Sequence, residues 1–195
     1  MNRYLLSCVA AGSLTLILSG CGGSAGLPQL SAAQPGTFSG DCASLASSIT
    51  GLTGTVITSA ATVAADTVVN NIKMPEHCQI KGKMNERVSS VDGATYYIGF
   101  EMRLPKTWNG RFYYQANGGT DGAIGNAVGA LGGGPVTSAL SKGFAVLSSD
   151  AGHQVQTTPF FGLDPQARID YGYNAVGQLT PMAKDLIKKV YGKAP

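Results

Sequence analysis

Residues 143–153, GFAVLSSDAGH, combine a short apolar run typical of a buried β-strand with a Gly-His turn. An amphipathic helical pattern follows from about Pro165 to Tyr191, and GKAP at 192–195 has the usual chemistry of a helix end. In a parallel α/β sheet the next element is another strand, and such folds place catalytic groups at its carboxyl end. We therefore expect the first half of a strand–helix–strand unit, with the chain ending before the strand that carries the nucleophile.

The residues before this unit predict mainly strands, followed by helices. The expected elements are a short helix (42–49), an extended segment (54–66), strands (77–82, 95–104 and 111–115) and two helices (123–131 and 136–142). Turn residues separate the strands, and the strand at 95–104 alternates with a period of two. Early antiparallel strands followed by strand, helix, strand and helix favour an α/β fold with a mixed sheet and flanking helices.

The first residues predict an export signal. A short basic start, MNRY, precedes a mostly apolar stretch at 5–18, which is shorter than the about 20 residues that a spanning helix needs. LSGC at 18–21 resembles a bacterial lipobox, in which Cys21 becomes the acylated first residue. The alternative is an ordinary signal peptide in which Cys21 is incidental. We expect a signal peptide at 1–20, a flexible Gly/Ser/Pro-rich tether at 21–41 and one domain at 42–195.

The cysteine count supports export. Of the four cysteines, Cys8 lies in the signal and Cys21 at the lipid site, which leaves Cys42 and Cys78. An even remainder in an exported chain predicts one disulfide, and closing a loop of this length is worth about 4 kcal/mol in chain entropy. The alternative is two buried free thiols. No Cys/His spacing resembles a zinc site.

Composition indicates a globular domain. Apolar residues make up 44% of the chain and charged residues 13%, which excludes a disordered or coiled-coil chain. The net charge of +3 is small and scattered, so we expect no nucleic-acid partner.

Four segments together resemble a known family. They are PEHCQIKG (75–82), RLP with WNGRF (103–112), SSDAGH (148–153) and FGLDPQARIDYGY (161–173). In this order they closely resemble the tannase/feruloyl esterase family, whose members are exported α/β-hydrolases that cleave aromatic carboxylic esters. Bacterial hydrolases of terephthalate monoesters belong to the same family. The resemblance therefore implies an incomplete α/β-hydrolase-type sheet, truncated before the nucleophile strand.

The resemblance also implies what lies outside the chain. It implies a Ser-His-Asp triad, with the nucleophile in a Cys-Ser-x-Gly-Gly turn beyond residue 195, and a calcium-binding lid inserted after it. It implies a disulfide that matches Cys42 and Cys78. The sequence would cover roughly the N-terminal third of such an enzyme. We expect no cofactor in this part and no activity from the chain alone.

One side of an active site is expected within the chain. An α/β-hydrolase draws one backbone oxyanion donor from the loop after an early strand, and NGGT at 117–120 directly follows the strand predicted at 111–115. Glycine lets a backbone N–H approach a substrate oxygen without a Cβ in the way. Gly118 or Gly119 is the candidate donor, and the alternative is a plain turn. Family members often carry a longer glycine run, whose first places are taken here by Ala116 and Asn117.

Other residues are assigned structural roles. GGSAG at 22–26 matches Gly-x-Ser-x-Gly, but Ser24 lies in the tether without the strand and helix that a nucleophile elbow needs. His153 comes too early for the base, because α/β-hydrolases place the histidine last, so we expect it to steady the 150–154 loop by hydrogen bonds. His77, beside the expected disulfide, is also expected to be structural.

The acidic residues are assigned to the scaffold as well. Asp164 and Pro165 look like a helix N-cap and first helical residue. Asp121 and Asp170 are most simply loop and helix-surface carboxylates, and no metal ligand is assigned.

Two functions remain. The first is a fragment of an exported serine carboxylic ester hydrolase for small aromatic esters of the gallate, feruloyl or terephthalate type, anchored through Cys21 at the outer membrane or secreted. The second is a non-catalytic surface lipoprotein that acts as a binding module. An apolar stripe on the last helix lacks the strand on which it should pack, which favours the fragment. The stripe consists of Ile169, Tyr173, Val176, Leu179, Met182, Leu186 and Val190.

Overall fold

The computed structural model describes residues 31–49, 51–129 and 137–195. Contacts divide the chain into two compact units, residues 1–32 and 33–195, and the following description concerns the second. The expected signal peptide, Cys21 and Ser24 lie outside the described residues. Within those ranges, no helix has the length and apolar character that crossing a membrane requires.

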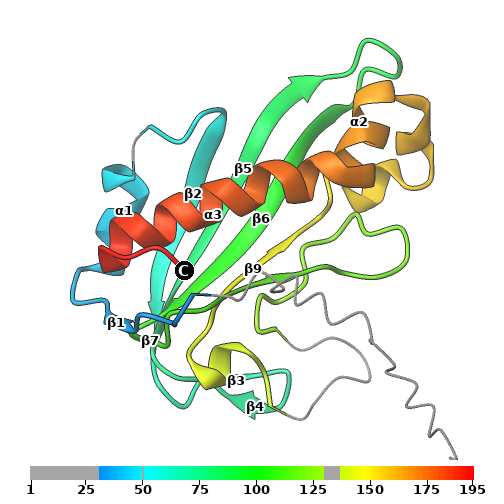
Figure 1. Cartoon of the computed structure of the whole chain (residues 1–195). Coiled ribbons are helices and arrows are strands. Elements are labelled where there is room, and N and C mark those ends of the chain that lie inside the picture. The colour runs from blue at the N-terminus through cyan, green and yellow to red at the C-terminus, as the bar shows by residue number, and fades with distance from the viewer. Residues whose placement is uncertain (1–30, 50, 130–136) are drawn as a thin grey trace, which may run out of the picture. The chain divides into compact units, whose positions relative to one another are not determined.

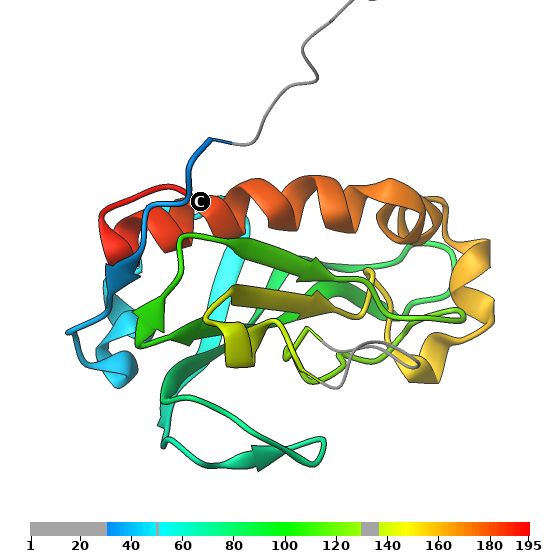
Figure 2. The same ribbon diagram turned by 60° about the horizontal axis from the view of Figure 1, so that its bottom comes forward.

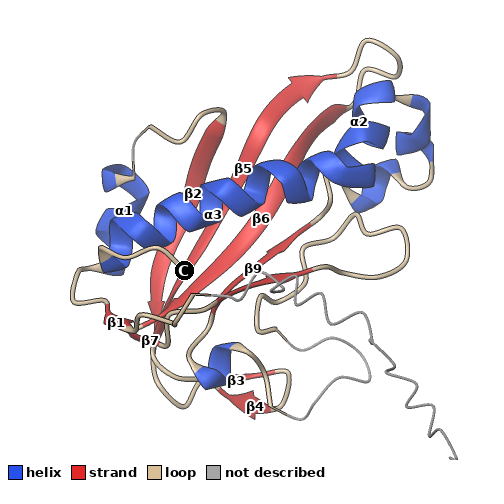
Figure 3. Ribbon diagram, viewed as in Figure 1, coloured by secondary structure: helices blue, strands red, loops and turns tan. Residues whose placement is uncertain are grey.

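A five-stranded mixed sheet forms the centre of this unit (Figures 1 and 3). Neighbouring strands are antiparallel except for the last two, β9 and β8, which run parallel. In spatial order the strands are β2 (Thr55–Val63), β5 (His77–Val88), β6 (Thr95–Pro105), β9 (Ala145–Ser149) and β8 (Phe112–Gln115). The predicted mixed sheet is confirmed, and the strand expected at 77–82 is longer than predicted.

Strand β9 is buried on both faces, which explains its continuous apolar run. Ala145 and Leu147 belong to the cluster that contains the last helix. Val146 points to the other face, where it packs with Val128 and Leu140. The strand that the sequence indicated most clearly is therefore a central part of the core.

The helical run predicted from 165 to 191 is confirmed, and it consists of three consecutive parts. These are α2 (Pro165–Ile169), a π-helical turn η4 (Asp170–Asn174) and α3 (Ala175–Tyr191). Asp164 is the N-cap, as predicted, and its Oδ1 accepts a hydrogen bond of 2.7 Å from the Ala167 N–H. Figure 2 shows α3 lying along one face of the sheet, with the hairpin β3–β4 (Val68–Val69 and Ile72–Lys73) on the opposite side.

The predicted apolar stripe is right from Leu179 onward and wrong for the members before it. Its later members are buried against the sheet (Leu179, Met182, Leu186), whereas its first members are 38%, 68% and 49% exposed (Ile169, Tyr173, Val176). A π-helical turn has more residues per turn than an α-helix, so η4 rotates Ile169, which precedes it, away from the face that α3 buries. The expectation that this stripe lacks a packing partner is therefore wrong for α3, which packs on strands of this chain.

The helices predicted at 123–131 and 136–142 are wrong. Residues 123–129 form no helix, residues 130–136 lie outside the described ranges, and only a 3₁₀ turn, η1 (Leu140–Lys142), forms after them. Side chains of the sheet bind the backbone of this segment instead. Glu101 Oε1 accepts from the Ala127 N–H at 3.1 Å, and Gln115 Oε1 accepts from the Gly129 N–H at 2.8 Å. These backbone groups are thus satisfied without a helix.

The predicted short helix and disulfide are both confirmed. Helix α1 (Cys42–Ser48) begins after Asp41, whose carboxylate caps it by accepting from the Ala43 and Ser44 N–H groups. Cys42 is bonded to Cys78 in β5, with the Cα atoms 5.5 Å apart. A further two-stranded pair, β1 (Gly36–Thr37) and β7 (Thr107–Trp108), lies beside the main sheet.

His77 takes a structural position, as predicted. It is buried at the start of β5, where its Nδ1 is 2.7 Å from the Pro75 carbonyl oxygen and its Nε2 is 3.0 Å from Arg103 Nη1. Arg103 in turn donates to Glu101 Oε1 at 2.7 Å. Since the guanidinium is always a donor, Nε2 accepts and the imidazole is neutral. Burial lowers the pKa of His77 accordingly.

Candidate active site

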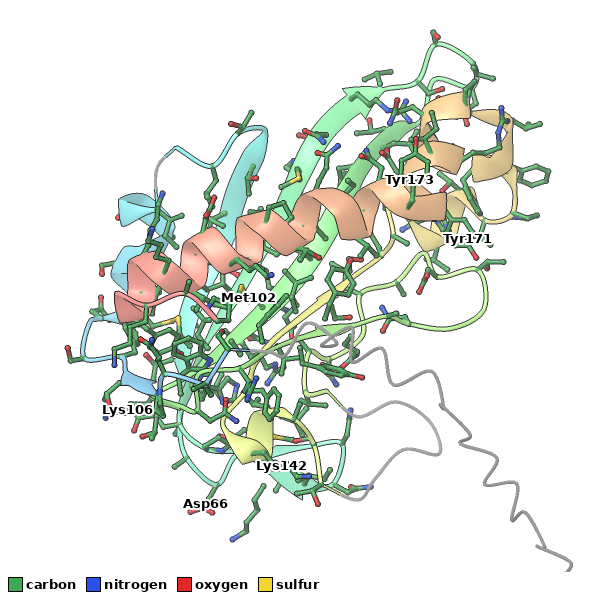
Figure 4. The ribbon with its side chains drawn as sticks, in the orientation of Figure 1. Asp66, Met102, Lys106, Lys142, Tyr171 and Tyr173 are labelled. Atoms are coloured by element: carbon green, nitrogen blue, oxygen red, sulfur yellow. A yellow bond between two sulfur atoms is a disulfide. The ribbon has the colours of Figure 1, made fainter. Side chains whose placement is uncertain are left out.

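The two parallel strands end at the same edge of the sheet. β8 leads into residues 116–122 and β9 leads into residues 150–154, and α/β proteins bind ligands outside the carboxyl ends of such strands. A surface pocket of about 330 Å³ lies here, and its walls come from both of these loops and from the η4–α3 junction. The structure brings the predicted Gly118 and Gly119 into this pocket together with Asp121, Tyr171 and Val176. Tyr171 and Tyr173 come from the π-helical turn (Figure 4).

The two glycines present free backbone donors. Gly119 has φ +67°, a left-handed conformation that glycine adopts without strain, and a Cβ on either glycine would meet no atom within 4 Å. Among the residues that the structure describes, neither the Gly118 nor the Gly119 N–H has a hydrogen-bond acceptor. Unpaired N–H groups beside a pocket are the chemistry that stabilises a developing oxyanion.

Hydrogen bonds fix how this loop is oriented. The Asp121 N–H donates to the Gly118 carbonyl at 3.3 Å, and the Tyr171 hydroxyl donates to the Gly119 carbonyl at 3.1 Å. The C=O and N–H of a trans peptide group point in opposite directions, so the first bond turns the Gly119 N–H away from the Asp121 backbone. This bond therefore fixes the orientation of the Gly118–Gly119 peptide group.

Asn117 anchors the loop to the end of β9. Its Nδ2 donates to the Ser149 carbonyl at 2.6 Å and to Ser148 Oγ at 3.1 Å, and its Oδ1 accepts from Gln115 Nε2 at 3.3 Å. An asparagine thus replaces a flexible glycine with a side chain that holds the loop in place. The sequence showed Asn117 only as a departure from a glycine run, because its partners lie 31 and 32 residues away.

The serines at the end of β9 are held by neighbours. Ser149 Oγ is 2.8 Å from the Tyr114 hydroxyl and accepts from the Ala151 N–H at 3.3 Å. Burial raises the pKa of Tyr114, so the phenol stays protonated. Neither Ser148 nor Ser149 makes a hydrogen bond to a histidine within the described ranges. Ser149 lines the pocket, and among the described residues neither hydroxyl has a histidine base to activate it.

Asp150 joins the loop after β9 to strand β6. Its Oδ1 accepts from the Gly99 and Gly152 N–H groups, both at 2.9 Å, and its Oδ2 accepts from Gln154 Nε2 at 3.2 Å. Burial raises its pKa to about 6, although these hydrogen bonds oppose the change. Gly152 has φ +93°, and a Cβ there would lie 2.4 Å from Asp170 Cβ, so only glycine fits this turn. Asp170 itself is buried, which corrects its prediction as a surface carboxylate.

The prediction that His153 is held by hydrogen bonds is wrong. The residue is fully buried, and neither ring nitrogen has a hydrogen-bond partner among the described residues. Its ring instead stacks on Phe161 at 3.7 Å between centroids and meets the edge of Tyr171 at 5.7 Å. Burial lowers its pKa and outweighs the opposing effect of the nearby Thr120 backbone. His153 and His77 are the two histidines of the chain, and neither forms a serine–histidine pair.

Asp121 lies in the pocket wall and is more than a plain loop carboxylate. Its φ is +55°, and its Oδ1 is buried without a hydrogen-bond partner among the described residues. Burial raises the pKa of this carboxyl group. Among the described residues, no group of three or more His, Cys, Asp or Glu side chains could hold a metal ion.

Comparisons with known proteins agree with this geometry. A family model described as "Tannase and feruloyl esterase" matches residues 78–195. A mono(2-hydroxyethyl) terephthalate hydrolase of Piscinibacter sakaiensis is 41% identical over 139 residues, which are 67% of this chain and 23% of that protein. A probable feruloyl esterase B-2 of Aspergillus flavus is 32% identical over 93 residues, which are 48% of this chain and 16% of that protein.

A solved structure shares the fold. The crystal structure of feruloyl esterase B from Aspergillus oryzae matches with a TM-score of 0.61 and 24% identity, over 77% of this chain and 29% of that chain. The chain spans a quarter or less of the length of the curated relatives that it matches. Because the family model covers more than half of the sequence, this chain belongs to the tannase and feruloyl esterase family.

Proposed function

We propose that this chain forms the oxyanion-binding part of a carboxylic ester hydrolase that acts on aromatic acid esters. The observation that carries the proposal is that the Gly118 and Gly119 N–H groups, in the loop after β8, have no acceptor among the described residues and line a pocket at the carboxyl ends of two parallel strands. The names of the relatives support the substrate class, since they include a terephthalate monoester hydrolase and a feruloyl esterase. Gallate, feruloyl and terephthalate esters are the candidate substrates.

The proposed mechanism places the Ser-His-Asp triad outside this chain. A serine activated by a histidine attacks the ester carbonyl, and the resulting oxyanion is held by the Gly119 N–H. The alcohol leaves, and water then hydrolyses the acyl-enzyme. β8 is the last strand of the described sheet, and a strand paired beside it would end next to the Gly118–Gly119 loop. That neighbouring strand is the place where an α/β-hydrolase carries its nucleophile elbow.

The test removes one backbone N–H at a time. The chain is extended with the C-terminal part of the terephthalate hydrolase relative, and the Gly118–Gly119 amide is replaced by an ester through semisynthesis. This change removes the Gly119 N–H and weakens the Gly118 carbonyl as an acceptor, whereas proline would not tolerate φ +67°. We expect kcat for an aromatic ester to fall by about 10²–10³. The matched control is the same replacement between Asn117 and Gly118, and full activity in both would refute the assignment.

The unextended chain provides a second check. Without nucleophile and base no acyl-enzyme forms, so the chain of 195 residues should not turn over aromatic esters. If the rate of ester hydrolysis instead rose in proportion to the concentration of this chain, the proposal that the triad lies outside it would be contradicted.

We also propose that the chain is exported and lipidated at Cys21. The support is the lipobox-like LSGC at 18–21 and the oxidised pair Cys42–Cys78, since disulfides persist in oxidising compartments. Metabolic labelling with a palmitate analogue should mark the wild type but not Cys21→Ser. Equal labelling of the two proteins would exclude lipidation at this residue.

A second candidate function is a non-catalytic binding module. It is favoured by one observation, that neither histidine pairs with a serine within residues 31–49, 51–129 and 137–195. The extended protein distinguishes the two functions. A binding module would bind aromatic acids without turnover even when the C-terminal part is present.

A further inference from the structure

The polar side chains of the pocket are committed to the protein, with one exception. The Asn117 amide is bound to the end of β9, and the Tyr171 hydroxyl donates to the Gly119 carbonyl. The Tyr114 hydroxyl and Ser149 Oγ are bound to each other at 2.8 Å. Only the carboxylate of Asp121 has no hydrogen-bond donor among the described residues, and its Oδ1 is buried. Its Oδ2 is not buried and has no donor among the described residues either, so a ligand that enters this pocket meets one unused charged acceptor there.

The pocket also lacks a positive charge. Within the described part of the chain, no lysine or arginine contributes to its walls, and Asp121 is its charged side chain. A half-buried carboxylate without a donor has lost part of its hydration, and a ligand hydroxyl that donates to it removes part of that cost. A second carboxylate at the same place would instead face like-charge repulsion with no cation to offset it.

We propose that Asp121 is a specificity-determining residue that favours aromatic esters with a phenolic hydroxyl over those with a free ring carboxylate. This inference rests on the proposed function and deepens it, because it chooses among the candidate substrates. The hydroxyl donates to the Asp121 carboxylate while the ester group lies at the Gly118–Gly119 loop of the same pocket. The chain would thus prefer hydroxylated rings, although one relative is a terephthalate monoester hydrolase.

Three probes that differ at one ring position test the proposal on the full chain. They are methyl 4-hydroxybenzoate, monomethyl terephthalate and methyl benzoate, which carry a hydroxyl, a carboxylate and a hydrogen opposite the ester. Binding is followed by NMR through the amide signals of Gly118 and Gly119 in the ¹⁵N-labelled chain. We expect the hydroxyl probe to bind most tightly and the carboxylate probe least tightly.

Asp121→Asn is the informative variant, because it removes the charge and keeps the shape. Asparagine adopts a left-handed conformation readily, so the variant should fold. We expect the ratio of the two affinities, hydroxyl over carboxylate, to fall about tenfold, as for loss of a charge-assisted hydrogen bond. Binding of methyl benzoate should stay within about twofold. Asp121→Gly, which tolerates φ +55° equally well, should lower the ratio in the same way.

Asp66→Asn is the matched control. Asp66 is exposed, has φ +64° and lies far from Tyr171 in Figure 4. Its substitution should leave all three affinities unchanged. If all probes bind and Asp121→Asn keeps the wild-type ratio, Asp121 does not select the substrate and the proposed function stands. If no probe shifts the Gly118 and Gly119 signals, the pocket does not bind aromatic esters and both proposals fail.

Discussion

Asp150 should make the chain less stable as the pH rises from about 4 to 7. The group is 3% exposed, and burial raises its pKa to about 6 from the ordinary 3.8. Between these two values the folded chain holds a proton that the unfolded chain has lost, so the free energy of unfolding falls as the pH rises. The difference of about two pKa units corresponds to about 3 kcal/mol, which is fully lost above pH 6.

The substitution Asp150→Asn removes this dependence. The asparagine oxygen can still accept from the Gly99 and Gly152 N–H groups, while its NH₂ replaces the acceptor that faces Gln154. The cost of that exchange does not vary with pH. The variant should therefore gain about 3 kcal/mol relative to the wild type between pH 4 and pH 7, whatever the offset at pH 4.

Urea unfolding at half-unit pH steps measures the difference. Subtracting the free energy of unfolding of the wild type from that of the variant cancels the contributions of all titrating groups that the two proteins share. Asp66→Asn removes an exposed carboxylate, and its difference from the wild type should stay within about 0.5 kcal/mol over the same range. If the difference in free energy of unfolding between Asp150→Asn and the wild type does not change with pH, the claim that ionisation of this buried carboxyl group destabilises the fold is refuted.

Two further outcomes concern the scaffold. Replacing Cys42 and Cys78 together with alanine should lower the free energy of unfolding by about 4 kcal/mol, as measured by urea unfolding, because an open loop regains chain entropy; equal stability of the two proteins would contradict this. The pKa of His77 is lowered by burial, so the folded chain binds its proton later than the unfolded chain and loses stability as the pH falls below 6.5. The stability advantage of the wild type over His77→Gln should therefore shrink on acidification in thermal unfolding, and a constant advantage would show that His77 does not titrate.

Local sequence patterns predicted an element correctly where that element can pack against any apolar surface. The apolar run of β9, the Asp164 cap and the helical run after it follow from periodicity and capping, which depend on near neighbours. The disulfide followed from counting cysteines in a chain that the sequence predicts to be exported. Any apolar face can pack on such elements, so their formation needs no particular distant residue.

Local sequence patterns did not predict the structure of segments whose conformation depends on a side chain that is distant in the sequence. Residues 123–129 were predicted as a helix although they include Gly125, Asn126 and Gly129, and Glu101 and Gln115 bind their backbone from the sheet. Asn117 and Asp121 acquire their roles from loop contacts and from a pocket that three separate segments form. The stacking of His153 on Phe161 likewise depends on how the loop after β9 folds back. No spacing in the sequence encodes these contacts.

The bond between Cys42 and Cys78 also determines how the domain bears a mechanical load. Tension applied at residue 41 reaches the first residue of α1 and passes through the disulfide directly into β5. The segment between the two cysteines, which includes the edge strand β2, is closed off by a covalent link and carries no part of this force. A pull from the N-terminal side would therefore act on β5, which is held by strands on both sides, and would not peel β2 from the sheet one hydrogen bond at a time.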